Sequence, residues 1–305
     1  MLKNWDQRLK TMKVLIIQEN GRHQENRHLR ECFSMQRALQ FLEVKCDVWG
    51  LGHRVNPIDD PMPDFESYDL IINLENYDET GWVPDLSEVR KPLKFLWAID
   101  SHARGHEVYE EEFKRGKYDL ILQATKFFVD ENSTWLPNAY DDDFLKPLST
   151  PKLHNTGFCG NVHNREGLLH FANDNWGCKL DVMVLGEKMV EAINSYKVHM
   201  NANIGADINF RNFETLGCGT VLAAVAYNLE QEVQYEELGF VNGENCILLG
   251  RNSPEDIIAS ISVVIDDDTA RIKMEQAGLE LVKKHTYKER AKTIIELWRN
   301  LEEKR

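Results

Sequence analysis

Short, almost continuous apolar runs alternate with amphipathic stretches along the chain, and this alternation limits the possible folds more than any other feature. In the first half, apolar runs of strand length occupy residues 13–18, 44–49, 68–73, 93–99 and 118–123. Strands buried on both faces have this composition because helices cover both sides of a parallel sheet. The pattern therefore predicts an α/β fold built on a doubly wound parallel sheet.

The second half of the chain repeats this pattern. Apolar runs occupy residues 156–160, 180–185, 198–203 and 220–224, with helical stretches between them. Ser253 is followed by a proline and two acids, which is typical of the start of a helix. A chain of 305 residues has room for two domains of about 150 residues each. We therefore predict two Rossmann-like domains.

Pro147 and Pro151 bracket a polar segment that separates the two halves. The segment predicts an N-terminal Rossmann-like domain over residues 1–150, a second Rossmann-like domain over 151–286 and a C-terminal helix over 287–305. Ligands of open parallel sheets bind beyond the carboxyl ends of the strands, and pockets favour domain junctions. We expect the two domains to face each other across a cleft that holds the site.

The overall charge of the chain is acidic. Asp and Glu number 50 against 36 Lys and Arg, for a formal net charge of -14, and no dense basic run occurs. Nucleic-acid binders normally carry a basic patch, so the sequence has no strong nucleic-acid signature. No apolar run approaches the roughly 18 residues that a membrane span needs, and the N-terminus is too polar for a signal peptide. We expect a cytoplasmic protein without a membrane span.

The segment from Asn203 to Val221 carries the clearest chemistry. A helix predicted to begin near Asn209 would present unpaired backbone N–H groups and the positive end of its dipole, which suit a diphosphate. Arg211 in the first turn adds a planar fork for phosphate oxygens. Glu214, about one turn further, can accept hydrogen bonds from the two hydroxyls of a ribose. The alternative is a capped helix with a surface Arg–Glu ion pair.

Residues 211–222 have the form Arg-x-Phe-Glu-x-x-x-x-Gly-x-x-Leu. This resembles the donor-site signature of family-4-like glycosyltransferases, particularly the branch of the spore-maturation CgeB-type proteins. The resemblance extends more loosely over residues 156–299 and implies the GT-B fold, in which the first domain binds the acceptor and the second binds the nucleotide sugar. It implies that Glu214 binds the nucleotide ribose and that Arg211 and Asn212 face the diphosphate.

Further segments fit the same family. Residues 157–165 are similar to the glycine-rich first loop of the donor domain, so Gly160 and Arg165 are implied donor contacts. Residues 135–141 resemble the turn that ends the acceptor domain, and residues 287–298 resemble the last helix, which in the family packs back on the first domain. The late turn over residues 242–249 also matches.

One position departs from the family pattern. The fuller motif has a second acid eight positions before the ribose glutamate, where it contacts the donor sugar. Here that position is Ala206, with Asp207 beside it. The CgeB-type branch often lacks this acid, so the resemblance to this class of glycosyltransferase holds. The residues that contact the donor sugar stay open.

Polar residues follow two strands of the first domain. Asp100 and His102 come directly after an apolar run, so we expect them at the carboxyl edge of the sheet, where His102 can orient the acceptor or contact the donor phosphate and a nearby carboxylate can fix its tautomer. An ordinary loop histidine is the alternative. Gly21 follows the first strand and is either a ligand contact or a turn glycine.

No metal site is expected. The spacing of His102 and His106 matches two ligands on one helix, but Gly105 weakens a helix there and no acidic partner motif accompanies them. The acidic runs 141–143 and 266–268 are predicted to be solvated turns.

These observations predict an enzyme that transfers a sugar from a nucleoside diphosphate sugar, a UDP-sugar, to a hydroxyl of an acceptor. The resemblance implies retention of configuration without a metal, and no cofactor beyond this co-substrate is expected. The acceptor stays open between a glycan, a small molecule, a protein and a modified nucleic acid. The alternatives are a phage-type glucosyltransferase acting on modified DNA bases, a nucleotide-sugar epimerase and a nucleotide-sugar-binding protein without catalysis.

Overall fold

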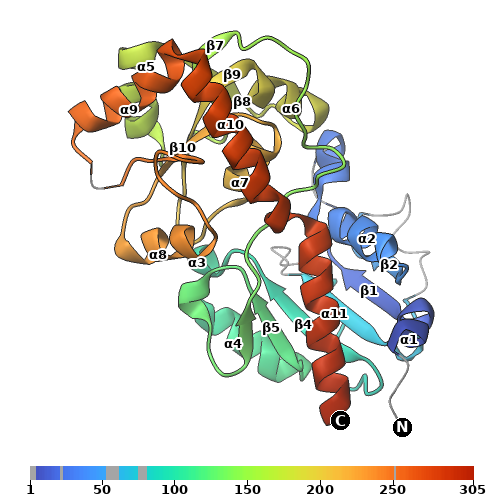
Figure 1. The fold of residues 1–305 in the computed structure, drawn as a ribbon. Helices are drawn as coiled ribbons and strands as arrows, with labels where there is room; N and C mark the ends of the chain where they lie inside the picture. Colours follow the sequence, from blue (N-terminus) through green and yellow to red (C-terminus); the bar gives the residue numbers. More distant parts are fainter. Residues whose placement is uncertain (1–4, 21–22, 53–61, 75–80, 251) are drawn as a thin grey trace. The chain divides into compact units, whose positions relative to one another are not determined.

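The structure is a computed structural model that describes residues 5–20, 23–52, 62–74, 81–250 and 252–305. It divides into two compact α/β units (Figure 1). Unit 1 comprises Met1–Pro137 together with Tyr287–Arg305, and unit 2 comprises Asn138–Thr286. None of the helices in the described ranges combines the length and the apolar character that a membrane crossing requires.

Unit 1 is built on a six-stranded sheet in the order β2-β1-β3-β4-β5-β6. All five strand pairings are parallel, which confirms the predicted sheet type. The central strands β3 and β4 are buried along their whole length because helices cover both faces. The strands are β1 (Lys13–Ile17), β2 (Lys45–Trp49), β3 (Leu70–Leu74), β4 (Leu93–Ala98), β5 (Leu120–Gln123) and β6 (Ser133–Trp135).

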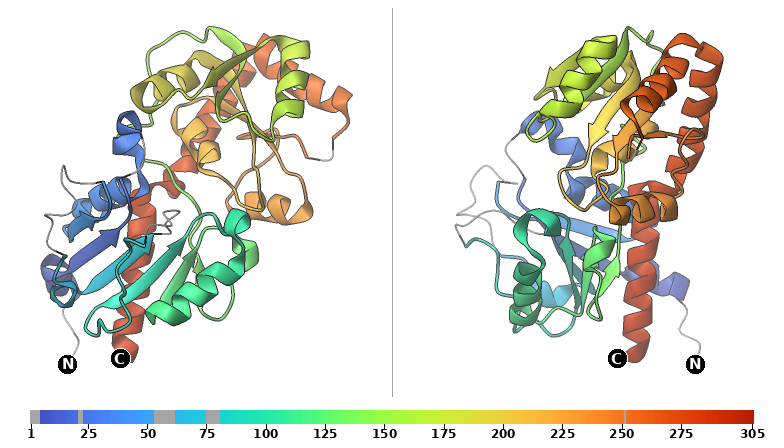
Figure 2. Two further views of the ribbon diagram at one scale, coloured as in Figure 1. Left: turned by 180° about the vertical axis from the view of Figure 1, so that it is seen from behind. Right: turned by 90° about the vertical axis from the view of Figure 1, so that its left-hand side faces the viewer.

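The helices of unit 1 are α1 (Trp5–Thr11), α2 (Glu31–Phe41), α3 (Ser101–Arg104), α4 (His106–Gly116) and α11 (Tyr287–Lys304), with 3-10 turns η1 (Gln24–Leu29), η2 (Phe65–Ser67) and η3 (Lys126–Phe128). Helices α4 and α11 lie on opposite faces of the sheet (Figure 2). Leu96 packs in one cluster with Tyr109 of α4, whereas the ring of Trp97 lies 6.4 Å from that of Tyr287 on α11. Successive side chains of a strand point to opposite faces, which explains this alternation.

Helix α11 is integral to unit 1 although it ends the chain. It packs along α2, and Trp298 is fully buried. The indole Nε1 of Trp298 donates a hydrogen bond to the backbone oxygen of Asp69 at 3.2 Å, just before β3. The guanidinium of Arg8 lies 4.9 Å from the centre of the same indole.

Unit 2 has a five-stranded parallel sheet in the order β11-β10-β9-β7-β8. Its strands are β7 (His154–Gly160), β8 (Cys178–Val182), β9 (Tyr196–Ala202), β10 (Val221–Val225) and β11 (Ile247–Leu248). Its helices are α5 (Glu166–Trp176), α6 (Gly186–Ser195), α7 (Phe210–Gly217), α8 (Leu229–Glu237), α9 (Pro254–Asp266) and α10 (Asp268–Val282), with the 3-10 turn η4 (Lys283–His285).

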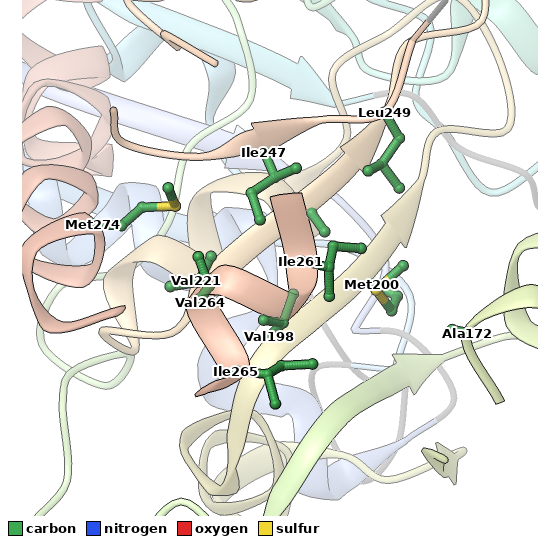
Figure 3. Packing of buried hydrophobic residues seen from close by; sticks show 11 residues of the cluster. Ala172, Val198, Met200, Val221, Ile247, Leu249, Ile261, Val264, Ile265 and Met274 are labelled. Atoms are coloured by element: carbon green, nitrogen blue, oxygen red, sulfur yellow. The ribbon is translucent and has the colours of Figure 1, made fainter. Parts of the chain in front are cut away.

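One face of this sheet carries the apolar core shown in Figure 3. Val198 and Met200 of β9 and Val221 of β10 face Ile261 of α9 and the other members of this cluster. The residue between the two β9 members, His199, points to the opposite face, where α7 lies. Strand β9 therefore presents an apolar face to α9 and a polar face to α7.

The two acidic runs differ in exposure: residues 266–268 are all exposed, as predicted, whereas Asp141 of the run 141–143 is buried. Asp267 caps α10, because its carboxylate accepts hydrogen bonds from the N–H groups of Thr269 at 2.8 Å and Ala270 at 3.3 Å. Asp141 is only 4% exposed, and its carboxylate accepts from the N–H of Asp143 at 3.1 Å. The prediction is therefore wrong for Asp141, which is an internal turn residue.

Candidate active site

Helix α7 begins where the sequence predicted it. Asn209 is the N-cap residue, but its side chain does not cap the helix. Its Oδ1 instead accepts from Nδ2 of Asn201 at 3.1 Å and from Nδ2 of Asn212 at 3.2 Å. In the described part of the chain, the backbone N–H groups of Phe210 and Arg211 have no acceptor. The first turn thus offers two N–H donors at the positive end of the helix, which is the arrangement that binds phosphate.

Asn212 does not fit the implied role of a diphosphate contact. It is fully buried. Its Nδ2 donates to Oδ1 of Asn203 at 2.9 Å, and its Oδ1 accepts from the hydroxyl of Tyr235 at 2.9 Å. The same Asn203 oxygen accepts from the N–H of Asn209 at 3.1 Å. Asn212 lies on the inner face of α7, so it holds the start of the helix against β9 and α8 and is not open to a ligand.

Arg211 and Glu214 lie one turn apart on α7 and form an ion pair of 2.7 Å. The alternative interpretation of this motif predicted an Arg–Glu pair at the surface, but the side chains are only 19% and 15% exposed. The Nη1 of Arg211 also lies 2.9 Å from Sδ of Met189. The site therefore holds a guanidinium and a carboxylate side by side in a sheltered position next to the free N–H groups.

The loop after β7 carries the two other implied donor contacts. Gly160 ends β7, and Arg165 precedes α5. The guanidinium of Arg165 donates to the backbone oxygen of Ala202, at the end of β9, at 2.9 Å, and to that of Asn161 at 2.8 Å. Burial lowers the pKa of Arg165, and the nearby charge of Arg211 lowers it further. Two guanidinium groups thus lie near each other at the carboxyl edge of β7 and β9.

In unit 1, Asp100 and His102 follow β4 at its carboxyl end, as predicted. Asp100 is the residue before α3, and His102 lies on α3 and is partly exposed. The hydroxyl of Ser101 donates to Oε1 of Gln123 at 2.6 Å, which ties α3 to the end of β5. Gly21 lies outside the described residues.

The spacing of His102 and His106 does not make a helical pair of ligands. Gly105 lies between them with a φ of 88°, so His102 belongs to α3 and His106 begins α4. His106 instead pairs with Glu110 and Asp130.

A family model described as glycosyl transferase-like matches residues 143–296, which is more than half of the chain. The chain belongs to this glycosyltransferase family. The match covers the whole segment from β7 to α10, including Arg211 and Glu214. No curated protein matches the sequence.

Solved structures of glycosyltransferases share the fold of this glycosyltransferase. Sucrose-phosphate synthase from Thermosynechococcus elongatus is 12% identical with a TM-score of 0.63, covering 96% of this chain and 100% of that chain. HepE from Anabaena, solved with UDP and glucose, is 11% identical with a TM-score of 0.60, covering 95% and 100%. A glycosyltransferase from Rickettsia africae is 8% identical with a TM-score of 0.59, covering 95% and 98%. The likeness shows that the fold is GT-B.

One central residue of this glycosyltransferase was not predicted. His199 of β9 is fully buried between the rings of Phe158 and Tyr196, at 6.0 and 5.8 Å. Its Nε2 accepts from the N–H of Cys159 at 3.1 Å, and its Nδ1 lies 3.1 Å from Oγ1 of Thr215. The sequence does place a histidine inside the apolar run 198–203, which indicates a buried side chain. The run alone does not indicate which residues that histidine contacts.

The hydrogen bonds fix the tautomer of His199. The hydroxyl of Thr215 donates to the backbone oxygen of Arg211 at 2.6 Å, so Oγ1 can only accept from the imidazole. Nδ1 therefore carries the proton and Nε2 accepts. Burial lowers the pKa of His199 well below its ordinary value, and the charges of Arg211 and Arg165 lower it further. The neutral ring joins the end of β7 to α7, the two elements that carry the site.

Proposed function

We propose that this glycosyltransferase transfers a hexosyl group from a nucleoside diphosphate sugar, with UDP as the nucleotide, to a hydroxyl of an acceptor. The observation that carries the proposal is the start of α7, where two free N–H groups, Arg211 and Glu214 lie together. HepE, a protein of the same fold, has been solved with UDP and glucose, which favours UDP-glucose among the donors.

Each group of the site has a distinct role in donor binding. The N–H groups of Phe210 and Arg211 and the guanidinium of Arg211 bind the diphosphate, because all three are hydrogen-bond donors of the first turn of α7. Glu214 accepts hydrogen bonds from the ribose hydroxyls. Arg165, held by the end of β9, adds positive charge beside the loop that begins after Gly160. Asn209 sets the backbone at the helix start.

The reaction breaks the bond between the anomeric carbon and the diphosphate oxygen and forms a bond from that carbon to the acceptor oxygen. The acceptor proton passes to an oxygen of the leaving phosphate. The helix end and the arginines stabilise the charge that develops on the leaving group, so the chemistry requires no metal. We assign retention of configuration to this reaction. We also propose that Asp100 and His102 hold the acceptor.

Within the family, we assign the chain to the CgeB-type branch, because Ala206 replaces the second acid of the fuller motif while Arg211 and Glu214 match it. We assign acceptor binding to the first domain, with the helix 287–305 as part of it, and donor binding to the second. The boundary predicted between residues 150 and 151 lies between Pro137 and Asn138 in the structure.

A thermal-shift panel of UDP-, GDP-, dTDP-, CDP- and ADP-sugars tests the donor. A ligand that binds only the folded state raises the melting temperature in proportion to the logarithm of its concentration over Kd. We expect the UDP-sugars to raise it and the other four classes to leave it unchanged. A shift with another nucleotide and none with UDP would refute UDP as the donor base.

A further inference from the structure

A histidine and two carboxylates converge in unit 1, apart from every residue assigned to sugar transfer. His106 and Glu110 lie one turn apart on α4, and Asp130 lies between η3 and β6. One ligand atom from each of the three lies within 4.8 Å of the other two. We propose that His106, Glu110 and Asp130 form a binding site for one divalent transition-metal ion of tetrahedral preference, such as Zn²⁺.

The distances between the three groups suit such an ion. Nε2 of His106 lies 3.4 Å from Oε1 of Glu110 and 3.7 Å from Oδ2 of Asp130. Zinc bonds to nitrogen and oxygen measure about 2.0–2.2 Å, so neighbouring ligands of a tetrahedron lie about 3.3–3.6 Å apart. The two distances from Nε2 match this spacing closely, and the ligand atoms of Glu110 and Asp130 lie within 4.8 Å of each other, so the two carboxylates can close on an ion bound at the histidine.

Neighbouring residues contact the side chains of Asp130 and His106 and limit their orientation. Oδ1 of Asp130 accepts from the N–H of Asn132 at 3.0 Å and from the hydroxyl of Ser133 at 2.7 Å, which directs Oδ2 toward the histidine. The imidazole of His106 stacks on the ring of Phe128, with centroids 5.5 Å apart and planes at 12°. Hydrogen-bond partners such as those of Asp130 fix the orientation of ligands in metal sites.

Glu110 lies between a lysine and the histidine. Its Oε2 lies 3.7 Å from Nζ of Lys114, one turn further on α4, and its Oε1 faces His106. The atoms that face one another are therefore Nε2 of His106, Oε1 of Glu110 and Oδ2 of Asp130.

The site is sheltered but open to an ion from solution. The side chains of His106, Glu110 and Asp130 are 19%, 39% and 30% exposed. A surface pocket of about 420 Å³ is lined by Glu110 and Asp130, two of the three residues. Three protein ligands leave a fourth tetrahedral position for water.

The chemistry of the ligands selects the ion. One imidazole and two carboxylates balance the charge of a divalent ion and suit zinc, whereas Mg²⁺ prefers oxygen ligands alone. A bound ion would join α4 to the turn before β6. His106 follows directly on the segment that carries Asp100 and His102, so the ion would also fix the end of that segment. The site shares no residue with the donor site, so it stands independently of the proposed function.

Isothermal titration of the tag-free full chain with Zn²⁺ alone tests the proposal. We expect saturable binding of one ion per chain. The ligand variants His106→Ala and Glu110→Gln should weaken it at least about 100-fold, and Ser133→Ala, which removes a hydrogen bond to Asp130, about tenfold. Mg²⁺ should show no saturable binding.

Two matched variants serve as controls. Glu111→Gln makes the same charge change at the neighbouring, exposed position of α4, and His170→Ala removes an exposed histidine of unit 2. Both should bind Zn²⁺ like the wild type. The proposal is overturned if the wild type shows no saturable binding, which would leave only a histidine–carboxylate ion pair. It is equally overturned if His106→Ala and Glu110→Gln bind as the controls do while their circular dichroism spectra match the wild type.

Discussion

His199 connects the chemistry of one side chain to the stability of unit 2. Both ring nitrogens are used in neutral hydrogen bonds, to the N–H of Cys159 and the hydroxyl of Thr215. A proton on Nε2 would remove the acceptor of Cys159 and place a charge near two arginines, which agrees with the lowered pKa. His199 therefore stays neutral in the folded protein at a pH where the same histidine of the unfolded chain binds a proton.

This difference predicts how the free energy of unfolding depends on pH. The unfolded histidine binds a proton near pH 6.5, and the folded one binds it only at much lower pH. The stabilisation is therefore complete above about pH 6.5 and is lost as the pH falls below it, by up to about 1.4 kcal/mol per pH unit. Urea unfolding between pH 5.0 and 7.5 measures this slope.

The variant His199→Gln isolates the contribution of this residue. Its unfolding free energy should depend less steeply on pH below 6.5 than that of the wild type, whatever its stability at pH 7.5. Equal slopes for the two proteins would show that His199 is not the group responsible.

At the scale of single elements, the conformation of Gly219 at the end of α7 determines how a substitution there changes the free energy of unfolding. Gly219 has a φ of 65°, and its N–H and that of Thr220 donate to the carbonyls of Leu216 at 2.9 Å and Thr215 at 3.3 Å. This is a Schellman motif, whose left-handed position favours glycine. A Cβ there would also lie 3.0 Å from Cγ of Pro147.

We expect Gly219→Ala to lower the free energy of unfolding by about 1–2 kcal/mol, because alanine disfavours the left-handed conformation. Gly167→Ala is the matched control, since Gly167 lies on α5 with no atom within 4 Å of an added Cβ. That control should be neutral or gain up to about 1 kcal/mol from its higher helix propensity. Urea unfolding compares the two variants, and equal effects would contradict the role of the left-handed turn.

The elements also show what the sequence can predict. Ser253 caps α9 and Pro254 occupies its first turn, as local chemistry predicts. Strand β8 was predicted at 180–185 and lies at Cys178–Val182. It is an edge strand whose residues are mostly not buried, so its apolar run does not determine where pairing with β7 begins. Asn209 was predicted at a helix start, but its contacts to Asn201 and Asn212 depend on tertiary structure.

At the scale of the whole molecule, the chain leaves unit 1 at Pro137 and returns to it at Tyr287. Trp298 is fully buried in unit 1, and its indole donates to Asp69. We expect Trp298→Ala to destabilise unit 1 by about 3–5 kcal/mol, through the cavity and the lost hydrogen bond. Hydrogen exchange followed by mass spectrometry should show faster exchange in β1 and β3 and no change in β9 and β10.

Glu303→Ala, at an exposed position of the same helix, is the control and should leave exchange in all four strands unchanged. Equal acceleration in both units would contradict the assignment of α11 to unit 1 alone.

Parallel sheets and their helices could be predicted for both units because strands covered on both faces leave a continuous apolar signal. The donor motif was also visible, since Arg211, Glu214 and the helix start are neighbours in sequence. The burial of Asp141 and Asn212 and the contacts of His199 were not, because these depend on residues distant along the chain.

Calorimetric titration with UDP tests most directly whether the start of α7 binds the nucleotide of the donor. Glu214→Ala removes the proposed acceptor of the ribose hydroxyls, and Glu230→Ala removes an exposed glutamate of α8 as the control. Hydrogen bonds to a charged group contribute about 1.5–3 kcal/mol, so Glu214→Ala should weaken UDP binding about 10- to 150-fold, with Glu230→Ala unchanged. Wild-type affinity for UDP in a folded Glu214→Ala variant would contradict the account.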